Sequence, residues 1–155
     1  MVVWSAGLLL YRRHPALEVF IAHMGGPFWA RKDDGAWSIP KGEFDPDSEP
    51  PRDAAHREFR EELGVAPPPG EWTELGTFTS SSSKKIVVFA GEGTGFPASA
   101  LVFGEFEMEW PPRSGRTASF PEVDRAEWTD LDAARDRLVK GQRPVLDALE
   151  KLITA

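Results

Sequence analysis

Residues 51–64 read PRDAAHREFREELG, and this stretch carries the clearest pattern in the chain. A proline suits the first position of a helix and a glycine commonly ends one, so the spacing predicts a helix over 51–63. The helical repeat of 3.6 residues places Glu58, Glu61 and Glu62 within an arc of roughly 100°. The predicted helix therefore presents three carboxylates on one face.

An apolar stripe adjoins this acidic face. Ala55, Phe59 and Leu63 are spaced by four residues and can dock the helix against a sheet. On the acidic face, like charges at helical spacing oppose stability by a few tenths of a kcal/mol when exposed and by more when buried. A solvated face is the ordinary explanation of such a run when it stands alone, and a bound cation is the alternative.

The chain contains no cysteine, which excludes disulfides, thiolate catalysis and sulfur-ligated zinc or iron. Its three histidines, His14, His23 and His56, are scattered and form no pair at metal-ligand spacing. We therefore expect Mg²⁺ (or Mn²⁺) as the cofactor, because these cations prefer carboxylate oxygens and leave positions for water and substrate phosphates.

Composition limits the class of protein and its partners. The 155 residues, 41% of them hydrophobic, predict a single globular domain over 1–155. A net charge of −7 argues against an extended nucleic-acid surface, whereas a small phosphorylated substrate needs only a local basic patch. No apolar run has the length of a membrane span, so we expect a cytoplasmic protein that does not bind a membrane. A lack of asparagine and an excess of arginine over lysine suggest a bacterial source.

The remaining chain divides into predicted strands, loops and two further helices. A turn is predicted at Arg13-His14-Pro15 and another over 80–83, and loops over 25–35, 41–50 and 111–120. Runs rich in apolar and β-branched residues predict strands over 2–10, 17–24, 37–40, 71–79, 85–90, 101–110 and 122–128, and helical spacing predicts helices over 131–139 and 145–152. This order favours an α/β sandwich or α+β fold over regular βαβ winding.

Reading outward from the helix, Gly42, Glu49 and the run from Arg57 to Val65 closely resemble the Nudix box. One departure is visible: the family pattern has five residues between its first glycine and first glutamate, and here residues 43–48 make six. The resemblance implies an α+β fold, the Nudix-type α/β/α sandwich. Such a fold has a mixed β-sheet, the catalytic helix at about 51–63 and C-terminal helices.

The resemblance also assigns roles to residues of this sequence. It implies that the metal is held by Glu58, Glu61, Glu62 and the backbone carbonyl of Lys41, and that Glu61 acts in catalysis. Glu49 and Arg57 resemble the family's structural ion pair. Nudix enzymes often use a later carboxylate, for which Glu122 is the candidate, with a surface acid as the alternative. Three alternating acids, Glu105, Glu107 and Glu109, are instead expected on a solvated sheet face.

The implied activity is metal-dependent hydrolysis of a diphosphate linkage by in-line attack of water. We rank a nucleoside triphosphate or related nucleotide first as the substrate and a dinucleoside polyphosphate second. A non-catalytic module that senses a nucleotide or ADP-ribose compound is the alternative from another class, and a purely structural cation is a third. The predicted substrate-binding residues, any of which could instead be ordinary surface or packing residues, are Lys41, Lys84, Arg113, Arg116, Phe28 and Trp29.

Overall fold

The computed structural model describes residues 1–13 and 15–155. Most of the strands belong to one mixed sheet, and β7 and β8 form a separate hairpin. The strands are β1 (Val3–Arg13), β2 (Leu17–Met24), β3 (Trp37–Ser38), β4 (Lys41–Glu43), β5 (Thr73–Ser81), β6 (Lys84–Glu92), β7 (Glu105–Glu109), β8 (Thr117–Pro121) and β9 (Val123–Asp130). The helices are α1 (Pro51–Leu63), α2 (Leu131–Arg137) and α3 (Arg143–Thr154), with short 3₁₀ turns η1 (Ala98–Ala100) and η2 (Lys140–Gln142).

The large sheet has the order β3-β2-β1-β6-β5, with β9 added to β2 and β4 added to β1. The β1–β6 pair is parallel and the other pairs are antiparallel. One edge of β1 is shared by two strands, because β2 pairs with it over Tyr11–Arg13 and β4 pairs with it over Ser5–Gly7. The start of β4 is thereby brought into the middle of the molecule.

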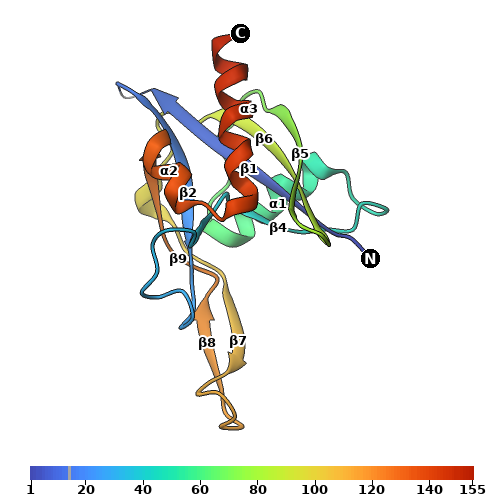
Figure 1. Cartoon of the computed structure of the whole chain (residues 1–155), viewed down its shortest axis with the longest axis vertical. Helices are drawn as coiled ribbons and strands as arrows, with labels where there is room; N and C mark the ends of the chain where they lie inside the picture. The colour runs from blue at the N-terminus through green and yellow to red at the C-terminus, as the bar shows by residue number, and fades with distance from the viewer. Residues whose placement is uncertain (14) are drawn as a thin grey trace.

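Helices cover both faces of this sheet, α1 on one side and α2 with α3 on the other (Figure 1). Alternate residues of β1 face opposite layers: Leu8 and Leu10 pack with Phe59 of α1, whereas Leu9 packs with Leu146 of α3. Strands buried on both faces read as continuous apolar runs, which is the pattern of β1 and β6. The predicted α/β/α sandwich with a mixed sheet and C-terminal helices is confirmed.

The hairpin of β7 and β8 projects away from the sandwich (Figure 1). Its acidic residues Glu105, Glu107 and Glu109 are exposed, as predicted, while the intervening side chains are partly buried. None of the helices in the described residues has the length and apolar character needed to cross a membrane.

Several predicted boundaries were wrong, each because a distant partner determines the local structure. The predicted loop 41–50 begins with strand β4, which pairs with β1. The predicted strand 101–110 is a strand only over Glu105–Glu109, because the Val102 N–H donates to the Leu63 carbonyl at the end of α1.

The end of the predicted loop 111–120 was also wrong, because Thr117–Pro121 forms β8 opposite β7. The helix predicted over 131–139 stops at Arg137, since the Val139 N–H donates to the Trp37 carbonyl instead. Strand β1 runs on to Arg13 along β6 and β2. In the predicted turn at residues 13–15, His14 lies outside the described residues.

Candidate active site

Helix α1 has the predicted bounds, and its two ends have simple causes. Pro50 is extended, and Pro51 occupies the first turn, where no backbone N–H is needed. Gly64 ends the helix with φ 74°, a left-handed conformation that glycine adopts without strain, and its N–H donates to the Arg60 carbonyl. Phe59 and Leu63 are fully buried against the sheet, contributing on the order of 2 kcal/mol each. This packing fixes the direction of the acidic face.

Arg57 binds three of the glutamates around this face. Its Nε and Nη2 atoms donate to the two carboxylate oxygens of Glu49 at 2.9 and 2.8 Å. Its Nη1 atom donates to Glu58 Oε1 at 2.7 Å and to Glu61 Oε2 at 3.1 Å. The hydrogen bonds from Arg57 lower the pKa of Glu49, and those to Glu49 and Glu58 raise the pKa of Arg57.

The extra residue in the loop before α1 is accommodated within a tight turn. The Ser48 and Glu49 N–H groups both donate to the Asp45 carbonyl, and the Asp47 N–H donates to the Asp45 side chain at 2.9 Å. The loop therefore still delivers Glu49 to Arg57.

Glu58 and Glu62 lie on the less exposed side of the acidic face. Burial raises the pKa of Glu58 in spite of its bond to Arg57. Burial likewise raises the pKa of Glu62 to about 8, with the negative charges of Glu122 and Glu58 acting in the same direction. Lys41 opposes this rise through its charge and a backbone hydrogen bond. The site thus concentrates negative charge that its own lysine only partly offsets.

Gly42 gives the Glu58 carboxylate its space. A Cβ atom at this position would lie 1.8 Å from Glu58 Oε2 and 2.1 Å from Glu58 Cδ. Strand β4 therefore passes directly against the carboxylate, and only a residue without a side chain permits this approach.

Glu122 reaches the same place through a chain of backbone hydrogen bonds. The Gly104 N–H donates to the Glu62 carbonyl, and the Glu122 N–H donates to the Gly104 carbonyl at 2.8 Å. On the other side, the Gly25 N–H donates to the Glu122 carbonyl at 2.9 Å. A Cβ atom at Gly104 would lie 3.1 Å from the Glu61 carbonyl oxygen and 3.8 Å from Glu122 Oε2, so the Glu122 carboxylate lies beside the helix, where its charge raises the pKa of Glu58 and Glu62.

The donor set fits a hard divalent cation. Glu58, Glu61 and Glu62 supply carboxylate oxygens, and the raised pKa values of Glu58 and Glu62 show that added positive charge would stabilise their ionised forms. Within residues 1–13 and 15–155, however, no three acidic or histidine side chains already converge on one point. The Glu61 carboxylate, whose side chain is 59% exposed, binds Arg57.

Two of the predicted substrate-binding residues, Lys41 and Lys84, line one pocket of about 280 Å³. Its other lining residues are Met24, Ser38, Ser80, Ser81, Val139 and Gln142. Because Lys41 also acts on Glu62, this pocket adjoins the acidic face. A larger hollow of about 380 Å³ has acidic Glu71 and Glu92 in its wall and, among the described residues, no lysine or arginine, so it suits an anionic ligand poorly.

Arg113 and Arg116 lie at the turn of the β7–β8 hairpin, where the backbone N–H of Arg113 donates to Glu109 Oε1. Glu105 pairs with Pro121 at the base of the hairpin, and Glu109 pairs with Thr117 near its tip. Four residue steps of strand separate the two pairs, which corresponds to about 14 Å. These arginines are therefore separated from Glu122 by the length of the hairpin.

The two predicted aromatic residues differ in their surroundings. Phe28 is 59% exposed, and its ring lies edge-on to Trp110 of the hairpin with 5.7 Å between the centroids. Trp29 packs against the core cluster on the α3 side of the sheet. Phe28 is thus the better placed of the two for contact with a ligand.

Sequence reasoning missed the residues that position Glu122. At Gly25 a Cβ atom would lie 2.0 Å from the Pro121 carbonyl oxygen, a requirement with no local signature in a glycine-rich loop. His23 and Asp124 form a side-chain hydrogen bond of 2.7 Å. A signal for His23 did exist, because it continues the alternation of Val19 and Ile21 and so had to point inward.

The family model for the NUDIX domain matches residues 1–149 of this chain. No curated protein matches the chain. Many solved structures share its fold, and three of them, all at low sequence identity, illustrate the likeness. An Ap4A hydrolase from C. elegans, solved as a binary complex, has 20% identity and a TM-score of 0.62, with 99% of this chain and 98% of that chain covered.

The second is the NUDIX domain of Shewanella oneidensis NrtR complexed with ADP ribose. It has 17% identity and a TM-score of 0.62, with 98% of this chain and 89% of that chain covered. The third is the MutT protein from Methanosarcina mazei Go1, with 17% identity, a TM-score of 0.63, and 99% and 96% covered. Because the family model spans nearly the whole chain, this protein belongs to the Nudix family, whose hydrolases act on pyrophosphate bonds.

Proposed function

We propose that the chain hydrolyses a diphosphate linkage in a nucleotide, with a nucleoside triphosphate or related compound as the first-ranked substrate. The observation that carries this proposal is the position of Glu122, which backbone hydrogen bonds through Gly104 tie to Glu62 of α1, where the charge of Lys41 also acts. These groups come from three separate parts of the chain. A solvated acidic helix would have no need of the fourth carboxylate.

The residues proposed to hold Mg²⁺ or Mn²⁺ are Glu58, Glu61, Glu62 and the Lys41 carbonyl. When bound, the cation neutralises phosphate charge and lowers the pKa of a coordinated water. The Glu49–Arg57 pair supports this set by tying the preceding loop to the helix. Arg57 also holds Glu58 and Glu61 through a single nitrogen, which limits their freedom before a substrate arrives.

In the proposed reaction, a water oxygen forms a bond to one phosphorus of the diphosphate. The bridging P–O bond breaks opposite to it, and the leaving phosphate oxygen keeps the electron pair. Glu122 accepts the proton of the water: Glu58 and Glu61 are paired with Arg57, and Glu62, which like Glu122 has no ion-pair partner within the described residues, is proposed to hold the cation. Glu61 orients the water.

The pocket next to this site supports a nucleotide. Lys41 and Lys84 can neutralise phosphate oxygens, while Met24 and Val139 offer apolar contact to a flat base. A dinucleoside polyphosphate is the second candidate substrate. The C. elegans structure carries the name Ap4A hydrolase, and a longer substrate could extend from the pocket toward Arg113 and Arg116.

A sensor that binds without cleaving is the alternative from another class, since the NrtR domain was solved with ADP ribose. Hydrolysis and sensing are separated by measuring product release from nucleoside triphosphates, dinucleoside polyphosphates and ADP-ribose compounds with Mg²⁺ or Mn²⁺. We expect turnover that depends on the cation and falls by about 10²-fold or more in Glu61→Gln and Glu62→Gln.

The matched control is Glu107→Gln, an exposed acid on the hairpin that should retain full activity. Tight binding with no turnover across the whole panel would replace the hydrolase by the sensor. Turnover that survives in both helix variants would show that the acidic face is not the active site.

A further inference from the structure

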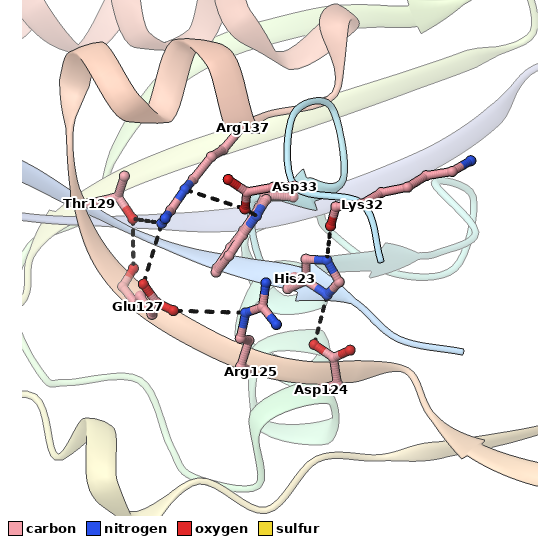
Figure 2. Close-up of polar contacts among 9 residues, drawn as sticks. His23, Lys32, Asp33, Asp124, Arg125, Glu127, Thr129 and Arg137 are labelled. Carbon is pink, nitrogen blue, oxygen red and sulfur yellow. Dashed lines mark hydrogen bonds and ion pairs between the residues drawn. The ribbon is translucent and has the colours of Figure 1, made fainter. Parts of the chain in front are cut away.

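His23 connects three segments on the side of the sheet opposite α1. Its ring is fully buried at the end of β2. Nδ1 lies 2.7 Å from Asp124 Oδ1, and Nε2 lies 2.6 Å from the Lys32 carbonyl oxygen (Figure 2). A backbone carbonyl only accepts hydrogen bonds, so Nε2 carries a hydrogen. The ring is thereby fixed between β9 and the loop 25–36.

Asp124 occupies a bulge in β9. His23 pairs with Arg125, but the next residue, Met24, pairs with Val123, so Asp124 is the extra residue of the ladder. Bulges of this kind redirect side chains. Glu122 stands two residues before Asp124, in the bend between the end of β8 at Pro121 and the start of β9 at Val123.

Here the two acids point to opposite faces. Glu122 lies on the α1 side: a Cβ atom at Gly104, whose N–H donates to the Glu62 carbonyl, would lie 3.1 Å from the Glu61 carbonyl oxygen and 3.8 Å from Glu122 Oε2. Asp124 faces His23, whose ring packs edge-on against Trp37 on the other side, with 5.2 Å between the centroids. The bend at Glu122 and the bulge at Asp124 together let the two acids diverge within three residues.

We propose that His23 and Asp124 are positioning residues: their hydrogen bond pins the bulge that holds Glu122 toward the glutamate helix. This inference rests on the proposed function and extends it to residues that touch no substrate. Two other contacts lie nearby: Asp33 accepts from Trp37 Nε1, and Arg137 donates to Glu127, whose Oε2 lies 3.8 Å from Arg125 Nε (Figure 2). Among the side-chain hydrogen bonds of the described residues, however, only that of His23 reaches Asp124 itself.

The test is a double-mutant cycle on kcat, measured with the substrate and cation that give turnover in the unmodified chain. His23→Leu removes both hydrogen bonds and should lower kcat by roughly 10- to 100-fold, with KM nearly unchanged, because the misplaced group acts on the reacting water. In a Glu122→Gln background, His23→Leu should cause less than about a twofold further loss, since the residue through which it acts is already disabled.

Two variants of Asp124, whose side chain is partly exposed, test the same hydrogen bond from its other end. Asp124→Leu removes the acceptor and should repeat the loss seen in His23→Leu, whereas Asp124→Asn retains an oxygen acceptor and should restore kcat to within about threefold. This pair decides the question if His23→Leu fails to fold. Asp33→Ala, which loosens the same loop without touching the bulge, and Leu149→Ala, which loosens the core at α3, should leave kcat unchanged while the protein is folded.

The outcomes separate the two proposals. Multiplied losses in the double variant, or equal loss in Asp124→Asn and Asp124→Leu, would overturn the positioning role and leave the hydrolase standing. An unmodified chain with no turnover would instead remove the proposed function and this inference with it.

Discussion

Glu58, Glu61 and Glu62 reach the site from a single helix, whereas Glu122 reaches it from a turn between two strands, held by the backbones of Gly104 and Gly25. The helix is fixed by its own hydrogen bonds and by an apolar stripe packed on the sheet. The turn has no such internal support.

Because of this difference, substitutions near the helix and substitutions near the turn should affect activity and stability differently. A substitution near the helix moves the carboxylate group of one glutamate, because the helical backbone that carries it is rigid. A change near the turn displaces backbone, and with it every group that the turn carries. Activity and stability should therefore fall together in the turn and separately around the helix.

The largest effect is expected for Gly25→Ala. The new Cβ atom would lie 2.0 Å from the Pro121 carbonyl oxygen and 2.9 Å from its carbon, so backbone must move. We expect kcat to fall by about 100-fold and the free energy of unfolding by about 2 kcal/mol. Urea unfolding and steady-state kinetics measure both. Gly95→Ala, at another loop glycine, is the control. No atom of the described residues lies within 4 Å of its Cβ position and its φ is 83°, so this variant measures backbone strain without a collision.

Gly42→Ala tests the helix. It introduces a Cβ atom about as close to its nearest neighbour as the one introduced by Gly25→Ala. The three atoms nearest to its Cβ, from 1.8 to 2.6 Å away, all belong to the Glu58 side chain and not to backbone, so that side chain can give way. We expect kcat/KM to fall by roughly 30-fold and the free energy of unfolding to change by less than about 0.5 kcal/mol. A stability loss as large as that of Gly25→Ala would contradict the proposed contrast between the helix and the turn.

The pH dependence of stability sharpens the comparison further. The pKa of Glu62 is raised from 4.5 in its ordinary state to about 8 in the fold, so the folded protein holds this proton more tightly than the unfolded chain. Stability from this source is complete below about pH 4.5 and is lost as pH rises to about 8.

Because Glu62 keeps part of its exposure to water, we expect a loss of about 1–3 kcal/mol in cation-free buffer, measured by urea unfolding across this range. Glu62→Gln should remove this part of the pH dependence, and Mg²⁺ should restore stability at pH 8. An unchanged pH profile in Glu62→Gln, with Glu107→Gln as the control, would contradict the assignment.

The smallest effect is expected at the tip of the hairpin. Arg113→Ala and Arg116→Ala should change KM for a nucleoside triphosphate by less than about twofold, because the hairpin separates these residues from Glu122 by about 14 Å. If a dinucleoside polyphosphate is the better substrate, its KM should rise several-fold in the same variants. A large rise in KM for the triphosphate would show that the hairpin folds over the site.

The sequence by itself determined the bounds of α1 and its acidic face, because helical periodicity and the residues at helix ends specify this local geometry. The pairing of Glu49 with Arg57 was implied by the resemblance to the Nudix box, and the structure has it. Gly42 was also identified from the sequence, although its reason, room for Glu58, appears only in the fold.

Tertiary structure alone decided strand β4, the course of residues 101–104, and the surroundings of Glu122. Each depends on hydrogen bonds between segments far apart in the chain, such as Gly104 with Glu62 or His23 with Asp124. Such bonds leave no periodic pattern, because the partners are chosen by which strands meet in space. The late carboxylate was predicted from the family resemblance and its position in the sequence, whereas the backbone hydrogen bonds to Gly104 and Gly25 that hold it appear only in the fold.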